Sequence, residues 1–192
     1  MHQAAESTKM EAQMKRHKYL VWLRGALAFG LAFGAFLAVG GASAQTPALV
    51  SVSPEYQLVG PRQEFSVQVR IDDAAELYAF DVLLSFPPDL FEVLTVTDEN
   101  FLTPGLGGDP FIDNEAGTVN VIHAQMNPAE PVSGGGVLFT VVFLARGASA
   151  SADLLIGKAE LSDRDGFLLA CETRGGAVRL GDYALFLPAL FR

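Results

Sequence analysis

Apolar and polar residues alternate along much of the chain, most clearly over residues 77–96. Five apolar side chains there recur at every second position: Tyr78, Phe80, Val82, Leu84 and Phe86. This spacing places all five on one face of a β-strand, and it places Asp81 and Leu83 on the opposite face. Pro87 and Pro88 end the strand, because neither has an N–H to donate to a neighbouring strand. A strand with one apolar face needs a second sheet to cover it.

The same pattern predicts further strands, separated by segments rich in glycine, proline or aspartate. The expected strands cover residues 50–52, 65–71, 90–96, 118–125, 137–145, 154–161, 167–171 and 177–180. Turns or loops are expected over residues 58–61, 72–76, 98–113, 128–136 and 147–152, the third of them interrupted by a short strand around Phe111. About nine strands without an amphipathic helix are typical of an all-β protein, a sandwich of two sheets packed face to face.

The first 44 residues differ in kind from the rest and have the pattern of a secretory signal peptide. Residues 15–18 supply three basic side chains, residues 25–39 are mostly apolar, and residues 42–44 are small enough for a cleavage site. We expect a signal-peptide helix, cleavage after Ala44, and a secreted protein. The alternative is an uncleaved membrane anchor, but an apolar run of about 15 residues is shorter than the ~20 that span a bilayer.

The expected domain organisation follows from these patterns. Residues 45–57 form a linker and a first strand, residues 58–182 form the sandwich, and residues 183–192 form a C-terminal tail. The tail is too short to span a bilayer and contains Pro188. We expect a disordered or docked terminus, with attachment of the protein to the cell surface as the alternative role of the tail.

Charge and cysteine content narrow the function classes. The formal net charge is −9, and removal of residues 1–44 makes the chain still more acidic, because that segment is basic. A surface this negative repels phosphate groups, so nucleic acid and anionic lipid are not expected partners. Cys171 is the only cysteine. An intramolecular disulfide is therefore excluded, and the fold depends on its apolar core.

No constellation of residues in the sequence indicates catalysis. His123 is the only histidine after residue 45, and it has the apolar parity of its strand, where a structural histidine is expected. A Gly-x-Ser-x-Gly motif is missing as well. We therefore expect a protein that is not an enzyme and has no cofactor. The turn over residues 163–166 (DRDG) begins like a calcium loop but lacks the distal glutamate, so solvated turns are favoured over weak calcium binding and no metal site is predicted.

Four ordered segments of the chain carry a resemblance to a known family. They are Val59-Gly60 followed by Phe65-x-Val67-x-Val69, residues 79–90 (AFDVLLSFPPDL), residues 134–143 (GGGVLFTVVF), and residues 161–163 (LSD) followed by residues 175–180 (GGAVRL). In this order they resemble the cohesin domain, the receptor module that holds dockerin-bearing proteins in cellulosomes. The likeness spans residues 58–182. It implies a nine-stranded jelly-roll sandwich and a non-catalytic module that binds a dockerin-type protein through one exposed sheet face.

The resemblance also indicates which residues would bind the partner. Asp81 matches an aspartate that hydrogen-bonds the dockerin in this family, and it has the outward parity that such a role needs. Leu83 shares that parity, and an exposed aliphatic side chain can anchor an interface. Ile122 has the outward parity of the strand over residues 118–125, and Gln125 stands where the family often has a glutamate. Asp81, Leu83, Ile122 and Gln125 are therefore the expected partner-binding residues.

Two other functions stay open at this point. Related sandwiches bind polysaccharides by stacking a planar row of exposed Trp or Tyr rings on the sugars. The only tryptophan, Trp22, lies in the signal peptide, and the tyrosines after residue 45 are Tyr56, Tyr78 and Tyr183. The sequence therefore offers few Trp or Tyr side chains from which such a row of rings could form. The remaining alternative is a structural domain of the cell surface.

Overall fold

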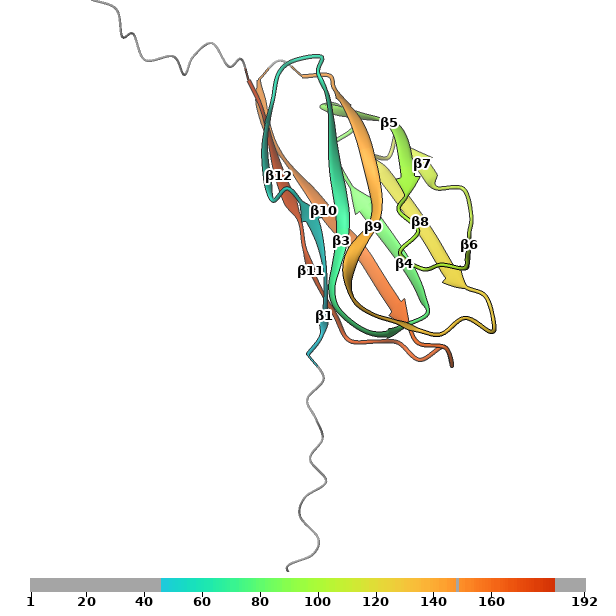
Figure 1. Ribbon diagram of the computed structural model, residues 1–192. Helices are drawn as coiled ribbons and strands as arrows, with labels where there is room; N and C mark the ends of the chain where they lie inside the picture. Colours follow the sequence, from blue (N-terminus) through green and yellow to red (C-terminus); the bar gives the residue numbers. More distant parts are fainter. Residues whose placement is uncertain (1–45, 148, 182–192) are drawn as a thin grey trace, which may run out of the picture. The chain divides into compact units, whose positions relative to one another are not determined.

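The computed structural model describes residues 46–147 and 149–181, and every regular element within them is a β-strand (Figure 1). The strands are β1 (Ala48–Ser53), β2 (Tyr56–Val59), β3 (Glu64–Leu77), β4 (Ala79–Ser85), β5 (Phe91–Asp98), β6 (Gly105–Gly107), β7 (Phe111–Asp113), β8 (Thr118–Gln125), β9 (Val132–Ala145), β10 (Ala150–Ser162), β11 (Cys171–Arg174) and β12 (Gly176–Leu180). In this part of the chain no helix is long and apolar enough to cross a membrane. The signal peptide predicted over residues 1–44 and the tail predicted over residues 183–192 lie outside the described residues.

The strands form two sheets that pack face to face (Figure 1). One sheet has five strands in the order β11-β1-β3-β9-β5. The other has seven strands, in the order β2-β12-β10-β4-β8-β6, with β7 also paired to β8. The pairs β1–β11 and β2–β12 are parallel, and the other ladders are antiparallel. The all-β sandwich that the alternating pattern predicts is therefore confirmed.

The core lies between the two sheets and takes one side of each long strand. On β4, Phe80, Val82 and Leu84 are buried, whereas Asp81 and Leu83 between them are only partly covered. β8 has the same alternation of buried and accessible positions. A strand that is covered on one face shows this period of two, so the pattern in the sequence determines which side chains point inward.

Four phenylalanine rings pack together in the core: Phe65, Phe86, Phe91 and Phe143. Phe143 of β9 is fully buried and contacts the other three rings. It stacks on Phe65 with ring centroids 5.3 Å apart, and it meets Phe86 edge-on at 5.2 Å. Phe143 belongs to the five-stranded sheet and Phe86 directly follows β4 of the other sheet, so this contact joins the two layers.

At the start of β4 the inward pattern differs from the prediction by one residue. Tyr78 is predicted to point inward, but the structure buries Leu77 and leaves Tyr78 partly exposed. Tyr78 connects β3 to β4: its N–H donates to Ser162 O, and its carbonyl accepts from the Gln125 N–H, both at 2.8 Å. The ring lies under the Arg164 guanidinium, 5.7 Å from it. A residue that connects two strands does not follow the pleat of either one. Its side chain therefore need not obey the alternation of inward and outward positions.

Two long strands extend through segments that are predicted to be loops. β3 continues through residues 72–76, and β9 begins inside the loop expected over residues 128–136. The two strands stay paired there with an irregular register, Ala74 opposite Gly134, and Asp73 takes a φ of 55°. A bulged ladder of polar and small residues has no regular period of two, so the pattern could not predict it.

Three further strand boundaries also differ from the prediction, by only a few residues each. β2 occupies the first half of the turn expected over residues 58–61, and β10 begins inside the turn expected over residues 147–152. The strand expected over residues 167–171 is reduced to a single bridge between Ser162 and Leu168, and β11 starts where it should end. These segments lie at strand ends or sheet edges, where few apolar contacts constrain the backbone.

β1 includes the first strand expected at residues 50–52, and it is a member of the five-stranded sheet. It lies between β11 and β3, with Val50 opposite Ile71 in the ladder. Val50 and Val52 are both buried. The sandwich therefore begins before residue 58, the boundary expected from the sequence.

We expect Phe143→Ala to destabilise the sandwich by about 3–5 kcal/mol, because it empties a fully buried site that three other rings line. Urea denaturation followed by tyrosine fluorescence measures the loss. The control is Phe167→Ala, at an exposed ring, where a change within about 0.5 kcal/mol is expected. Equal stabilities of the two variants would contradict this account of the core.

Candidate functional site

The outer face of the seven-stranded sheet brings together the residues that the sequence places outward. In the ladders, Asp81 of β4 lies opposite Ile122 of β8 on one side and opposite Glu160 of β10 on the other. Directly opposed residues of antiparallel strands share a face, so these three side chains form one row across the sheet. Ile122 is 53% exposed, and the Asp81 side chain is 24% exposed. Both therefore reach the solvent.

A second row runs parallel to the first. Leu83 of β4 lies opposite Asn120 of β8 and opposite Lys158 of β10. Leu83 is partly covered by its neighbours. The predicted grouping of Asp81, Leu83 and Ile122 on one outward face therefore agrees with the ladder register.

Asp81 is the centre of a polar network on this face. Its Oδ2 accepts a hydrogen bond from Lys158 Nζ at 2.7 Å, and Lys158 Nζ also lies 3.3 Å from Glu160 Oε2. With its amide nitrogen directed at the carboxylate, Asn120 donates to Asp81 Oδ1 and to Val82 O, both at 2.9 Å. The Asp81 carboxylate is thus held in one orientation by partners from both neighbouring strands.

The hydrogen bond with Asp81, and then the one with Glu160, raises the pKa of Lys158, although partial desolvation opposes them. The ordinary lysine pKa is already about 10.4. Because the pKa of Lys158 is higher in the folded state, its ion pair with Asp81 stabilises the fold fully below the ordinary lysine pKa. This stabilisation is lost only when the pH rises through the raised pKa of the folded state. Lys158 therefore keeps its positive charge throughout the physiological range.

A β-bulge in β10 brings Lys158 to this face. The register with β4 shifts between Ile156 and Lys158, so Gly157 is an extra residue in the strand. A Cβ on Gly157 would lie 3.2 Å from Ser85 Oγ and 3.5 Å from a Leu83 methyl carbon, so glycine suits the close approach of the two strands. Without the bulge, strict alternation would point Lys158 inward.

Exposed apolar side chains surround the polar network. Leu106 of β6 lies opposite Ala124, and Phe111 of β7 lies opposite Asn120, so both have the outward parity of β8. They are 65% and 66% exposed, and Leu155 of β10, opposite Ser85, is exposed as well. Clustered apolar groups around a few charges are typical of a protein-binding surface. We call this surface the outer-face patch: Asp81, Leu83, Leu106, Phe111, Asn120, Ile122, Leu155, Lys158 and Glu160.

His123 lies behind this surface, inside the sandwich. It is 5% exposed, its Nδ1 is hydrogen-bonded to the Asp98 carboxylate, and its ring lies 5.9 Å from that of Phe80. A Cβ on Gly105 would come within 2.2 Å of His123 Nε2, so the β6 backbone covers the imidazole. Asp98 ends β5 of the five-stranded sheet and His123 belongs to the other sheet, so the pair joins the two layers.

A sequence model of one protein family, described as the cohesin domain, matches residues 59–166. The match covers more than half of the chain and includes the strands that carry the outer-face patch, which are β4, β6, β7, β8 and β10. The chain belongs to the cohesin family. Cohesins are non-catalytic binding modules, and the family resemblance seen in the sequence is confirmed.

Solved structures of cohesins share the fold of this one. A non-cellulosomal cohesin from the hyperthermophilic archaeon Archaeoglobus fulgidus superimposes with a TM-score of 0.59 at 23% identity, covering 70% of this chain and 91% of that one. The cohesin of the Coh-OlpA–Doc918 complex from Clostridium thermocellum has a TM-score of 0.59 at 14% identity, over 70% of this chain and 99% of that one. CaCohA2 from Clostridium acetobutylicum has a TM-score of 0.58 at 16% identity, with 72% and 94% covered. A comparison with curated protein sequences found no match.

Gln125 does not belong to the outer-face patch of this cohesin. It shares the inward parity of Val119, Val121 and His123 on β8, and it is only 6% exposed. Its Oε1 atom is buried as well. The partner-binding role predicted for Gln125 rested on the family position and overlooked this parity, so we withdraw it.

The acidic turns of this cohesin use their carboxylates to fix the backbone. Asp163 Oδ1 accepts from the N–H groups of Asp165 and Phe167, at 3.0 and 2.8 Å. Asp113 Oδ1 does the same for the N–H groups of the two residues at 115–116. Over residues 46–147 and 149–181, no three His, Cys, Asp or Glu side chains are placed so that they could hold a metal ion.

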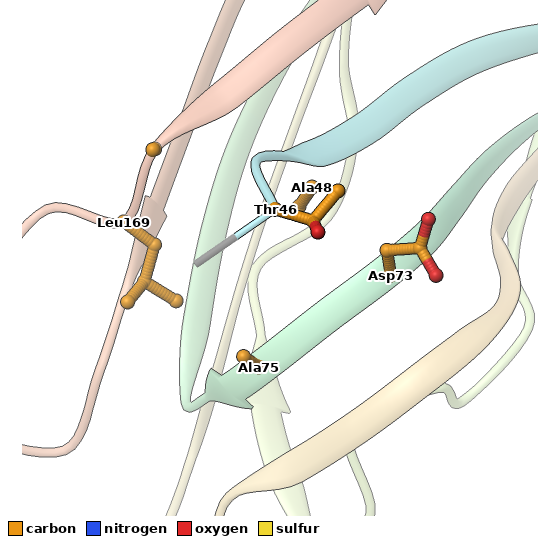
Figure 2. Close-up of a pocket in the computed structure, with 6 residues that line it drawn as sticks. Thr46, Ala48, Asp73, Ala75 and Leu169 are labelled. Carbon is orange, nitrogen blue, oxygen red and sulfur yellow. The ribbon is translucent and has the colours of Figure 1, made fainter. Parts of the chain in front are cut away.

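A small pocket and the thiol of Cys171 are two further places to consider as ligand-binding or reactive sites. The pocket lies where the start of β1, the irregular part of β3 and the segment before β11 meet; Thr46, Asp73 and Leu169 come from these three segments (Figure 2). Its volume of about 40 Å³ suits one or two water molecules. Burial raises the pKa of the Cys171 thiol, so it forms the nucleophilic thiolate less readily.

We expect Asp98→Ala to destabilise this cohesin by about 1–3 kcal/mol, because it leaves the buried Nδ1 of His123 without its partner. Thermal and urea denaturation measure the loss. Asp153→Ala, at an exposed position, serves as the control and should change stability by less than about 0.5 kcal/mol. If Asp98→Ala is as stable as the unmodified protein, the pair does not hold the sheets together.

Proposed function

We propose that this cohesin is a secreted, non-catalytic receptor module that binds a dockerin-type protein through the outer-face patch. The observation that carries the proposal is the common register of β4, β8 and β10. It places a fixed carboxylate, Asp81, in one row with the exposed Ile122. The structural relatives include cohesins solved in complex with dockerins from Clostridium thermocellum, which supports the choice of partner.

The composition of the patch indicates what kind of partner surface would fit. Ile122, Leu106 and Phe111 offer apolar area on the β6–β7–β8 side, where a partner's aliphatic side chains would be desolvated. Asp81 and Glu160 outnumber Lys158 at the centre, so the patch carries a net negative charge. A partner that presents hydroxyl, amide or basic side chains between apolar ones would match this arrangement.

A polysaccharide-binding function has weaker support. The exposed aromatic rings include Tyr56 on β2 and Phe111 on β7, which lie at opposite ends of the seven-stranded sheet. Tyr78 is covered by Arg164. These positions do not make the planar row of rings that stacking on a sugar chain needs, so the described residues favour a protein partner.

Calorimetric titration of the purified domain against the dockerins encoded in the same genome tests the proposal. Saturable binding of at least one dockerin is expected. Failure of all of them to bind would refute dockerin recognition, and retention of the domain on insoluble polysaccharides in a parallel pull-down would then favour the carbohydrate alternative. Secretion is tested separately, by locating the protein in the culture medium or on the cell surface.

We expect Ile122→Asp to weaken dockerin binding by about tenfold or more, because it puts an unpaired charge into the apolar part of the interface. The side chain is exposed, so the fold should tolerate the change. Phe167→Asp is the matched control: it also replaces an exposed apolar residue, but one that lies in the turn before β11 and does not belong to the patch. Equal affinities of the two variants would show that the partner binds elsewhere.

We also expect Asp81→Ala to weaken binding more than Glu160→Ala. Loss of Asp81 removes the acceptor that orients Lys158 and Asn120, whereas loss of Glu160 removes only the longer contact to Lys158. Dissociation constants of both variants, measured with circular dichroism spectra as the check on folding, decide the order. The reverse order would mean that the network around Asp81 does not serve recognition.

A further inference from the structure

The seven-stranded sheet has an open segment next to the outer-face patch. β4 ends at Ser85, which pairs with Leu155, but β10 begins five residues earlier at Ala150. On one side, residues 150–154 of β10 pair with β12. On the other side, no strand among the described residues continues the ladder beyond Ser85. In an antiparallel strand, alternate residues point their N–H and C=O groups to this second side.

The sequence explains why β4 stops short. The Phe86 N–H donates to Gly117 O on the β8 side, and Pro87 and Pro88 have no N–H to offer to β10. The chain then turns, since the Leu90 N–H donates to Pro87 O. The segment that would have continued the ladder therefore leaves the sheet.

This departure leaves a groove of about 390 Å³ beside β10. Phe86, Pro87 and Leu90 line one wall, and Ala152 and Leu155 belong to the other. The groove thus combines apolar walls with a strand edge that has no ladder partner in the described part of the chain. This combination suits an extended apolar peptide that adds to the sheet as a strand.

The chain supplies such a segment where the groove begins. Residues 182–192 (DYALFLPALFR) follow β12 after Gly181, and nine of these eleven residues are uncharged and mostly apolar. β12 ends at Leu180, opposite Ala150. A Cβ placed on Gly147 would lie 2.9 Å from a Leu90 methyl carbon and 3.0 Å from a Leu180 methyl carbon. The last residue of β12 and a wall residue of the groove are therefore close neighbours.

We propose that the tail of this cohesin docks in the groove and extends the sheet beside residues 150–154. Residues 183–187 precede Pro188, which cannot donate a ladder bond, so five residues are free to pair. This length matches the five positions of β10 that β4 leaves uncovered. A tail that turns back after β12 runs parallel to β10. The proposal does not depend on dockerin binding.

Hydrogen exchange followed by NMR tests the docking. Residues 45–192 contain every described strand and form a compact unit by themselves, so this domain is compared with the same domain ending at Gly181. The docked tail should slow exchange at alternate amides of residues 151–154 at least tenfold. Equal exchange rates at these amides in the two proteins would overturn the proposal.

Point variants separate docking from a general effect of truncation. Leu185→Asp lies within the pairing segment and should restore fast exchange at the same amides, while Arg192→Asp, beyond Pro188, should leave them protected. Both changes lie outside the described strands and leave the sandwich intact. Protection that survives Leu185→Asp would contradict the docking. So would protection that appears only at concentrations where the protein is dimeric, because the strand would then come from a second copy.

Discussion

The structure depends on the burial of one side of each strand between the two sheets. Phe80, Val82 and Leu84 on β4 are buried, and so is Phe143 on β9. A slip of β4 by one residue would expose its three buried side chains to water, and a slip of β9 would expose Phe143. The same constraint acts on the other face. Once the inner residues are fixed, Asp81 and Ile122 must point outward in one row. The candidate binding surface is therefore a consequence of core packing.

The polar network on this surface needs one departure from regular alternation. Leu154 and Leu161 of β10 are both buried, although they are seven residues apart and an odd spacing would put them on opposite faces. The extra residue at Gly157 resolves this conflict and, in doing so, turns Lys158 outward to Asp81. A bulge in one strand thus supplies the counter-charge for a carboxylate in the next one, and it lets a charged group sit among exposed apolar residues.

The sequence predicted those parts of the molecule where burial enforces a strict period of two. The boundaries of β8 and the sandwich architecture follow from that period, and so do the outward positions of Asp81, Leu83 and Ile122. Tyr78, residues 72–76 and the early start of β9 were mispredicted because turns and bulged ladders have no such period. Lys158 was missed for the same reason, although the odd spacing of Leu154 and Leu161 was a usable signal. The parity of Gln125 was also available and would have placed it inside.

A pair of prolines determines where β4 ends, and this affects both the outer-face patch and the groove beside β10. Pro87 and Pro88 terminate β4, which exposes the edge of β10 and opens the groove beside Leu155. Leu155 belongs to the outer-face patch as well as to the groove. Any segment that occupies the groove therefore borders the surface available to a partner protein and changes how much of Leu155 remains exposed. The same short proline pair thus ends β4, borders the patch at Leu155 and leaves a stretch of β10 where another strand could add.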